Sequence, residues 1–308
     1  MTTLLLQVIT PMQLLLRLIF RFFAALPLPI LHFLGTLLGS LTFYVSAKTR
    51  ARTQENIRIS QINEDYQSIN CLVKSTLQET AKSGLELPIA WCRDSQDVVK
   101  LFRQVHGWEH VEAAIAQDKG LLFITPHIGS YDLAGRFISE RLPFPLTAMY
   151  RPPKLSWLEP IMQSGRERDQ GRTAPANAQG VKIILKALKN KEATIVLPDQ
   201  VPTGGDGVWA KFFGQDAYSM TLAARLAQMS DVATLFFVGE RLPNGQGFDL
   251  HVYPLEGKIG RDKLENVQII NDNVEKLIRI FPQQYLFSYN RFKTPAGAEP
   301  KPSSVLKD

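Results

Sequence analysis

Short apolar runs alternate with longer amphipathic segments from about residue 117 onward. The runs "GLLFIT", "PLTAMY" and "ATIVLP" are each ended by turn residues, as is typical of buried strands. Residues 156–169 and 179–191 have helical periodicity, residues 233–257 resemble two strands around a Pro-Asn-Gly turn, and a long helix is expected over 262–280. This order predicts an α/β fold with a mixed, mostly parallel sheet flanked by helices.

The N-terminal region has a different pattern. Residues 24–45 form 22 consecutive positions without Asp, Glu, Lys or Arg, which is long enough to cross a bilayer. Proline and glycine within this segment would bend a spanning helix: Pro27, Pro29, Gly35 and Gly39. Basic residues flank it on both sides: Arg17, Arg21, Lys48, Arg50 and Arg52. A buried hairpin is the alternative, but buried helices are usually shorter and carry a polar stripe. We therefore expect membrane contact, by spanning the bilayer or by lying in its interface.

Three regions follow from these patterns. Residues 1–50 are expected to form the membrane anchor, and residues 51–295 a single catalytic domain whose first part, up to 116, is mainly helical. Residues 296–308, "AGAEPKPSSVLKD", have the composition of a disordered tail.

Composition narrows the classes of protein. Of 308 residues, 45% are hydrophobic and 21% charged, which is globular and neither disordered nor polytopic. Cys71 and Cys92 have no metal-ligand spacing and no secreted-disulfide density, which favours a reducing compartment. The net charge of +6 suits an anionic partner such as nucleic acid, an acidic membrane surface or a phosphorylated substrate. No basic motif interleaved with aromatic residues is present, which argues against nucleic acid.

The segment "ITPHIGSYDLAGR" carries the candidate chemistry. His127 follows a predicted strand and Asp132 begins a helical pattern, with Gly129 as a flexible corner and Ser130 as a helix cap between them. The carboxylate of Asp132 can hold one imidazole nitrogen and leave the other free as a base. No Gly-x-Ser-x-Gly nucleophile occurs, so His127 is expected to deprotonate a substrate hydroxyl that attacks an activated acyl group. The alternative is a capping Asp beside a structural His.

Three polar clusters follow other predicted strands, where ligand sites of α/β folds collect. They are "MYRPPK" with Arg151, "GRERDQGR" with Arg166, Arg168 and Arg172, and "VLPDQVPTGGDGVWAKFFG" with Asp199 and Gln200. Arginine suits phosphate, although any single arginine of the second cluster can equally be a solvated helix end. Arg151 is the strongest candidate, because it directly follows a strand.

Residues 117–293 resemble the lipid A late acyltransferases, the lauroyl and myristoyl transferases of Gram-negative bacteria. The resemblance rests on "KGLLFITPHIGSYD", "YRPPK", "GVKIILKALKNKEATIVLPDQVPTGGDGVWAKFFG" and "PQQYLFSYNRFK", in that order, and on the apolar N-terminus followed by "RTQENI".

The resemblance implies the fold of the His-x4-Asp/Glu glycerolipid acyltransferases. It also implies an acyl-carrier-protein donor, a phosphorylated lipid A precursor as acceptor, and a place on the cytoplasmic face of the bacterial inner membrane. His127 matches the family's catalytic base and Asp132 its carboxylate partner, which is commonly Glu. Arg151, Asp199 and Gln200 match the strand-end motifs, and Arg166 and Arg168 are less certain counterparts of a basic segment. No cofactor or metal is required.

Two alternatives to lipid A acylation stay open. The His-x4-Asp pair acts on a hydroxyl or an amine and does not depend on the rest of the acceptor. An acyltransferase acting on a lysophospholipid or an amino lipid would therefore have the same signature. A non-enzymatic, membrane-associated lipid-binding protein is the other, although intact His127, Asp132 and Arg151 argue against it.

Overall fold

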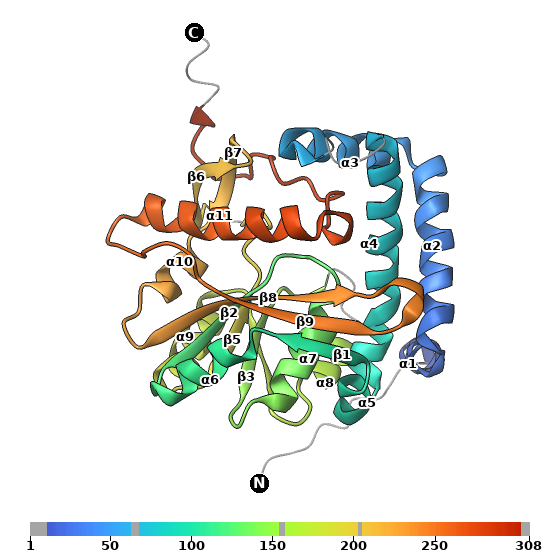
Figure 1. Cartoon of the computed structure of the whole chain (residues 1–308), viewed down its shortest axis with the longest axis horizontal. Coiled ribbons are helices and arrows are strands. Elements are labelled where there is room, and N and C mark those ends of the chain that lie inside the picture. Colours follow the sequence, from blue (N-terminus) through green and yellow to red (C-terminus); the bar gives the residue numbers. More distant parts are fainter. Residues whose placement is uncertain (1–10, 63–67, 154–157, 203–204, 303–308) are drawn as a thin grey trace.

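The computed structural model describes residues 11–62, 68–153, 158–202 and 205–302. Its centre is a seven-stranded sheet in the order β1-β9-β8-β2-β5-β3-β4, and a separate hairpin pairs β6 with β7 (Figure 1). The strands are β1 (Phe102–His106), β2 (Gly120–Ile124), β3 (Leu146–Tyr150), β4 (Gly171–Pro175), β5 (Ala193–Val196), β6 (Gly207–Phe212), β7 (Gln215–Met220), β8 (Val232–Arg241) and β9 (Phe248–Pro254).

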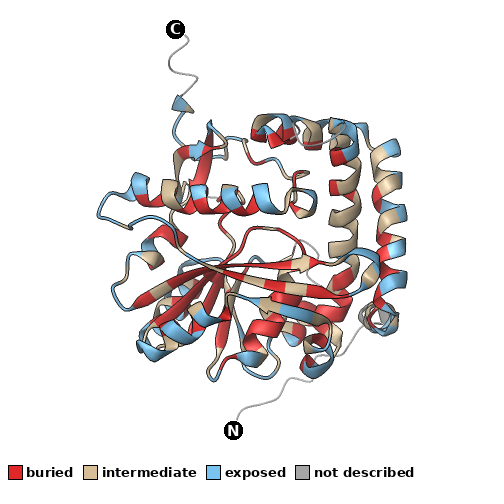
Figure 2. Ribbon diagram, in the orientation of Figure 1, coloured by how far each residue is buried: buried red, intermediate tan, exposed pale blue. Residues whose placement is uncertain are grey.

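The large sheet is mixed and mostly parallel, as predicted. Five of its neighbouring pairs run parallel, and only β8 and β9 pair antiparallel. The three predicted runs form β2, β5 and β3, and the predicted hairpin forms β8 and β9 around a short turn at Pro243–Gly245. Every residue of β2 and β5 is buried, which explains their continuous apolar sequences (Figure 2).

Helices cover both faces of the sheet. They are α1 (Pro11–Ala25), α2 (Leu28–Val45), α3 (Ala47–Ser60), α4 (Ile69–Cys92), α5 (Ser95–Val99), α6 (Trp108–Ala116), α7 (Tyr131–Arg141), α8 (Glu159–Arg166), α9 (Ala178–Lys189), α10 (Leu222–Ala227) and α11 (Lys263–Ile280). Buried side chains of α6 and α7 pack on one face, and those of α9, α10 and α11 contribute to the core on the other. Helix α11 also packs against the β6–β7 hairpin.

Helices α1 and α2 lie beside α4 at one end of the sheet (Figure 1). In the described part of the chain, α2 is the one helix long and apolar enough to cross a membrane by length and composition, and 28% of it is buried. Twelve of the fifteen exposed large hydrophobic side chains described are on α1 and α2. These twelve, here called the outer apolar face, are Leu14, Leu15, Leu18, Ile19, Phe22, Ile30, Phe33, Leu37, Leu38, Leu41, Tyr44 and Val45.

The region 51–116 is mainly helical, as expected, but it also contains β1, a short strand that was not predicted and that pairs with β9 at the sheet edge. Pro27 separates α2 from α1, whereas Gly35 and Gly39 do not interrupt α2, which is one continuous helix. They let it approach α4, since a Cβ on Gly39 would lie 2.3 Å from the Cα of Gln78. The division into anchor, catalytic domain and tail stays a prediction, and residues 303–308 of the tail lie outside the described residues.

Candidate active site

Neighbouring strands bring His127 and Asp199 together. Ile124, the last residue of β2, is in register with Val196, the last residue of β5. His127 and Asp199 each follow these strand ends by three residues, so parallel pairing carries both to the same edge of the sheet. Nδ1 of His127 lies 2.8 Å from Oδ1 of Asp199, and the backbone N–H of His127 donates to Oδ2 of Asp199 at 3.0 Å.

The turn that carries His127 is held by backbone hydrogen bonds from two other segments. Gly129 has a φ of 58°, which glycine adopts without strain, and its N–H donates to the carbonyl of Gln284 at 3.0 Å. The next N–H, of Ser130, donates to the carbonyl of Gly239 at 2.8 Å. A Cβ on Gly129 would lie 2.1 Å from that same carbonyl, so no larger residue fits this corner. The backbone of His127 is thereby fixed on three sides, by β5, β8 and the segment after α11.

The pairing of His127 with Asp132 expected from their spacing is wrong. Asp132 is the second residue of α7, and its Oδ1 accepts hydrogen bonds from Nη2 and Nε of Arg166 at 2.6 and 3.0 Å. Arg166 ends α8, so a helix far along the sequence takes the carboxylate that the motif assigned to His127. Oδ2 of Asp132 is buried and has no hydrogen-bond partner among the described residues.

Asp199 is the carboxylate that orients the imidazole. Burial on its own would raise the pKa of Asp199, but the charge of His127, its ring and backbone hydrogen bonds, and the charge of Arg291 bring that pKa below its ordinary value. Asp199 is therefore ionised at neutral pH and is the hydrogen-bond acceptor for Nδ1–H of His127. The other ring nitrogen, Nε2, makes no contact with Asp199, and the side-chain amide of Gln200 lies 3.1 Å from it.

The four arginines of the predicted ligand-binding clusters occupy different environments. Arg166 is fixed by Asp132. Arg168 donates to the backbone carbonyls of Cys92 and Arg93 at 3.3 and 3.1 Å, so part of its guanidinium is already engaged. Arg151 is exposed and forms no salt bridge within the residues that the structure describes. Arg172 lies 3.3 Å from Glu192.

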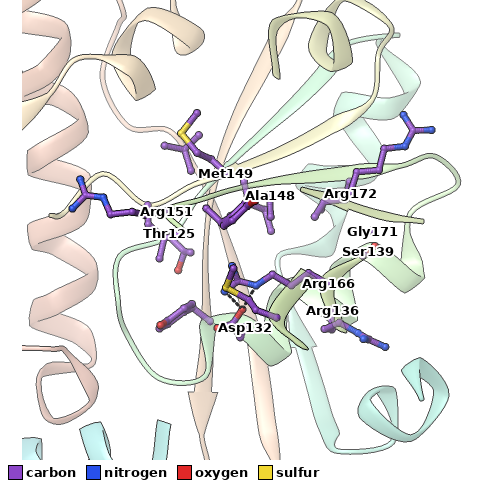
Figure 3. A pocket seen from close by; sticks show the side chains of 18 of the residues that line it. Thr125, Asp132, Arg136, Ser139, Ala148, Met149, Arg151, Arg166, Gly171 and Arg172 are labelled. Carbon is purple, nitrogen blue, oxygen red and sulfur yellow. Dashed lines mark hydrogen bonds and ion pairs between the residues drawn. The ribbon is translucent and has the colours of Figure 1, made fainter. Parts of the chain in front are cut away.

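These residues line one cavity of about 320 Å³, here called the arginine cavity. Its wall includes His127, Asp132, Gln200 and all four arginines just described, together with apolar side chains of β3, β5 and α8. Figure 3 shows Asp132 and Arg166 joined near the centre of the view, with Arg151 on one side and Arg172 on the other. Asp199 is absent from this wall; it supports His127 from behind.

Tyr131 is a neighbour of His127 that the sequence did not single out. Its ring centroid lies 5.1 Å from that of His127, and it lines the arginine cavity. Burial first, and then the charges of Asp132 and Asp199, raise the pKa of its phenol, so the hydroxyl stays protonated and can donate a hydrogen bond. Its contact with the His127 ring is visible only in three dimensions.

A second cavity of about 180 Å³ also reaches His127 and Tyr131. It lies between α4 and the segment around Gln284 and Leu286. We call it the α4 cavity.

The site can therefore perform general base chemistry. An imidazole whose Nδ1 is held by a buried carboxylate and whose Nε2 lies at a cavity has the geometry of a base for a bound hydroxyl. Within the described ranges no group of three or more His, Cys, Asp or Glu side chains converges to hold a metal ion. The arginines nearby suit an anionic ligand, with phosphate as the best geometric match.

Comparison with known proteins identifies the relatives of the chain. Residues 3–294 match a model of the family described as bacterial lipid A biosynthesis acyltransferase. The chain is 27% identical over 278 residues to a lipid A biosynthesis lauroyltransferase of Escherichia coli K12, and 27% identical over 274 residues to a lipid A biosynthesis palmitoleoyltransferase of the same organism. Each alignment covers 88% of both proteins. A lipid A biosynthesis acyltransferase of Haemophilus influenzae is 26% identical over 199 residues, 63% of this chain and 60% of that protein.

Proposed function

This chain belongs to the bacterial lipid A biosynthesis acyltransferases, and we propose that it moves a fatty acyl chain from acyl-carrier protein to a hydroxyl of a lipid A precursor. The observation that carries the proposal is the contact of Nδ1 of His127 with Asp199, because it leaves Nε2 as the nitrogen available to a substrate at the wall of a cavity lined with arginines.

The proposed reaction is a direct transfer. Nε2 of His127 accepts the proton of the acceptor hydroxyl while the hydroxyl oxygen attacks the carbonyl carbon of the acyl thioester. The new ester C–O bond forms, the C–S bond breaks, and the leaving sulfur takes the proton back from His127. Gln200, whose amide lies 3.1 Å from Nε2, must give way to the hydroxyl. Asp199 stays ionised throughout and stabilises the imidazolium that forms.

No protein nucleophile is needed for this reaction. Cys71 is exposed and Cys92 is partly buried, and neither lines the arginine cavity or the α4 cavity. Burial raises the pKa of the Cys92 thiol despite the opposing charges of Arg168 and Arg21, which lowers the fraction of reactive thiolate. We therefore propose that both substrates are bound together and that no acyl-enzyme forms.

The arginine cavity is proposed to bind the acceptor through its phosphate. Arg151 is exposed and unpaired among the described residues, so it can form a new charge-assisted contact at little cost. Arg166 is held in place by Asp132, so its remaining N–H groups enter the site already oriented. We assign Asp132 to this positioning role, and its unpartnered Oδ2 offers the substrate one further acceptor.

The outer apolar face is proposed to hold the enzyme on the cytoplasmic surface of the inner membrane. Inserting one of its leucine or phenylalanine side chains into lipid is worth about 1.5–3 kcal/mol. A few such side chains together exceed the binding of a single myristoyl chain, which gives only reversible attachment. The basic residues beside this face, Arg17, Arg21 and Lys48 among them, would add about 1 kcal/mol each on an anionic surface.

Mass spectrometry of lipid A tests the function directly. Cells that lack this protein should produce lipid A that is lighter by one fixed acyl mass, and the parent gene should restore that mass. His127→Ala should not restore it, although the variant protein should be present in the membrane fraction at the parent level. An unchanged lipid A together with an acyl group missing from another lipid would assign the enzyme to a different acceptor.

A further inference from the structure

Two cavities lined by different elements meet at the same pair of side chains. His127 and Tyr131 line both the arginine cavity and the α4 cavity. A transferase without an acyl-enzyme has to bring two substrates to one base at the same time, so two approaches to His127 are what its chemistry requires.

The α4 cavity has an uncharged polar lining. Thr80, Ser83, Gly84 and Leu87 follow the i, i+3, i+4, i+7 spacing of one helix face, and Gly129, Gln284 and Leu286 complete the wall with His127 and Tyr131. The hydroxyls of Thr80 and Ser83 can accept hydrogen bonds from an amide N–H, whereas the side-chain amide of Gln284 is already bonded to the backbone of Arg241. No Asp, Glu, Lys or Arg is among these lining residues. The arginine cavity differs sharply, because five arginines contribute to it.

This difference in charge separates the two substrates. A phosphate enclosed by uncharged groups would lose its hydration without gaining a counter-charge, which is costly, so a phosphorylated acceptor is favoured only in the arginine cavity. A neutral, linear group with amides loses less in the α4 cavity than a phosphate does, because it carries no charge and the hydroxyls of Thr80 and Ser83 can replace part of its water.

The α4 cavity is open to solvent at Gly84. This residue is exposed, and a Cβ built on it would meet no atom within 4 Å. A chain can therefore enter beside Gly84 and run inward to His127, while whatever carries the chain stays outside the protein.

We propose that the α4 cavity receives the neutral, amide-bearing arm that presents an acyl thioester, entering at Gly84. This inference rests on the proposed function. The thioester carbonyl lies at His127, where the acceptor oxygen attacks it. When the C–S bond breaks, the sulfur remains at the inner end of the α4 cavity, takes the proton from Nε2 of His127, and leaves with its arm through the same opening.

A substitution of Gly84 tests the proposal in the full-length enzyme. Gly84→Leu places a side chain across the opening, and helix α4 tolerates it because the added atoms project into open space. Steady-state transfer is measured with an acyl-carrier-protein thioester as donor and a phosphorylated lipid A precursor as acceptor. We expect the KM for the donor to rise about tenfold or more, with an unchanged KM for the acceptor and an unchanged melting temperature.

A matched variant controls for the added bulk. Asn70→Leu adds the same leucine to an exposed position of the same helix, away from both cavities, and should behave like the parent. An acyl thioester of 2-mercaptoethanol, which lacks the amide-bearing arm, should be used equally by the parent and by Gly84→Leu.

The outcomes separate this inference from the proposed function. A raised acceptor KM with an unchanged donor KM in Gly84→Leu would assign the α4 cavity to the acceptor and overturn the proposal. Unchanged constants for both substrates would also overturn it. Failure of the parent enzyme to transfer from any thioester would instead refute the proposed function, and the cavity assignment with it.

Discussion

Asp199→Asn tests which carboxylate orients the catalytic imidazole. The two oxygens of Asp199 accept from Nδ1 and from the backbone N–H of His127 at 2.8 and 3.0 Å. In the asparagine variant, the backbone N–H holds the one remaining oxygen, so the new NH₂ group faces Nδ1. That nitrogen must then accept a hydrogen bond, which moves the ring proton to Nε2.

The size of the effect follows from this change of tautomer. An imidazole protonated at Nε2 cannot accept the hydroxyl proton at that atom, and the carboxylate that stabilised the imidazolium is gone. The corresponding change in a serine protease triad lowers kcat about 10⁴-fold. An acceptor hydroxyl is about as weakly acidic as the serine hydroxyl of that triad. We therefore expect kcat to fall about 10³–10⁴-fold, which corresponds to an activation barrier higher by about 4–5.5 kcal/mol.

Asp132→Asn is the matched comparison. It also removes one carboxylate charge from the site, but the partner that loses it is Arg166 instead of His127. We expect a higher KM for a phosphorylated acceptor and a smaller loss of kcat than in Asp199→Asn. Both variants are assayed with saturating donor and with acceptors that carry or lack phosphate, and thermal melting verifies their folding. A folded Asp199→Asn enzyme with near-parent kcat, beside an Asp132→Asn enzyme inactive on both acceptors, would refute the assignment and restore the pairing suggested by the motif.

Three further variants test the phosphate site, the buried charges and the outer apolar face. Arg151→Ala should raise the KM of a phosphorylated acceptor about tenfold and leave use of an unphosphorylated acceptor unchanged; equal losses on both would indicate a structural arginine. Arg241→Met should lower the free energy of unfolding, measured in urea, by about 3–5 kcal/mol, because it leaves Glu86 buried without its main counter-charge. Burial raises the pKa of Glu86, but Arg241 and His32 outweigh burial and lower this pKa from 4.5 to about 2. The ionised carboxylate therefore adds about 3 kcal/mol to the free energy of unfolding above pH 4.5, and this contribution is lost as the pH falls toward 2. The acid dependence of stability should be weaker in Arg241→Met. Leu38→Glu should reduce co-sedimentation with anionic vesicles about tenfold, whereas Leu264→Glu, at an equally exposed leucine on α11, should bind like the parent.

The sequence predicted the elements whose environment is uniform along their length. Strands β2 and β5 are buried at every position, so their apolar runs are unbroken. Helix α11 begins one residue after Asp262, whose side chain accepts from the N–H of Glu265, which is a local capping signal. Strand β1 was missed because it lies at the sheet edge and alternates only weakly, with three exposed residues among five. Its place is set by pairing with β9, far along the chain.

The part of the site that could be predicted is the part that depends on local sequence signals. The sequence located His127, Arg151 and Asp199 correctly at strand ends, because a strand end is a local signal. It could not predict which residues touch, since that depends on the order of the strands in the sheet. Once β2 and β5 are known to be neighbours in register, equal offsets of three residues place Asp199 at His127. The spacing within one motif suggested Asp132 as the partner of His127 instead. In the structure Asp132 pairs with Arg166 of α8, a residue that is distant in the sequence but close in space.

The outer apolar face and the His127 turn are parts of one connected structure. On the inner side of α2, Nε2 of His32 lies 2.7 Å from Glu86 of α4, and Nη2 of Arg241 donates to the same carboxylate at 2.7 Å. The backbone N–H of Arg241 donates to the side-chain oxygen of Gln284 at 2.8 Å, and the carbonyl of Gln284 accepts from Gly129 in the His127 turn at 3.0 Å. A buried ion pair adds little net stability when compared with apolar packing, but its hydrogen bonds are directional and fix the relative positions of the groups that they join. The helix that we propose to rest on lipid is therefore held at a fixed position relative to the base, and this would let a rigid enzyme present His127 at a constant depth to an acceptor that is itself confined to the membrane.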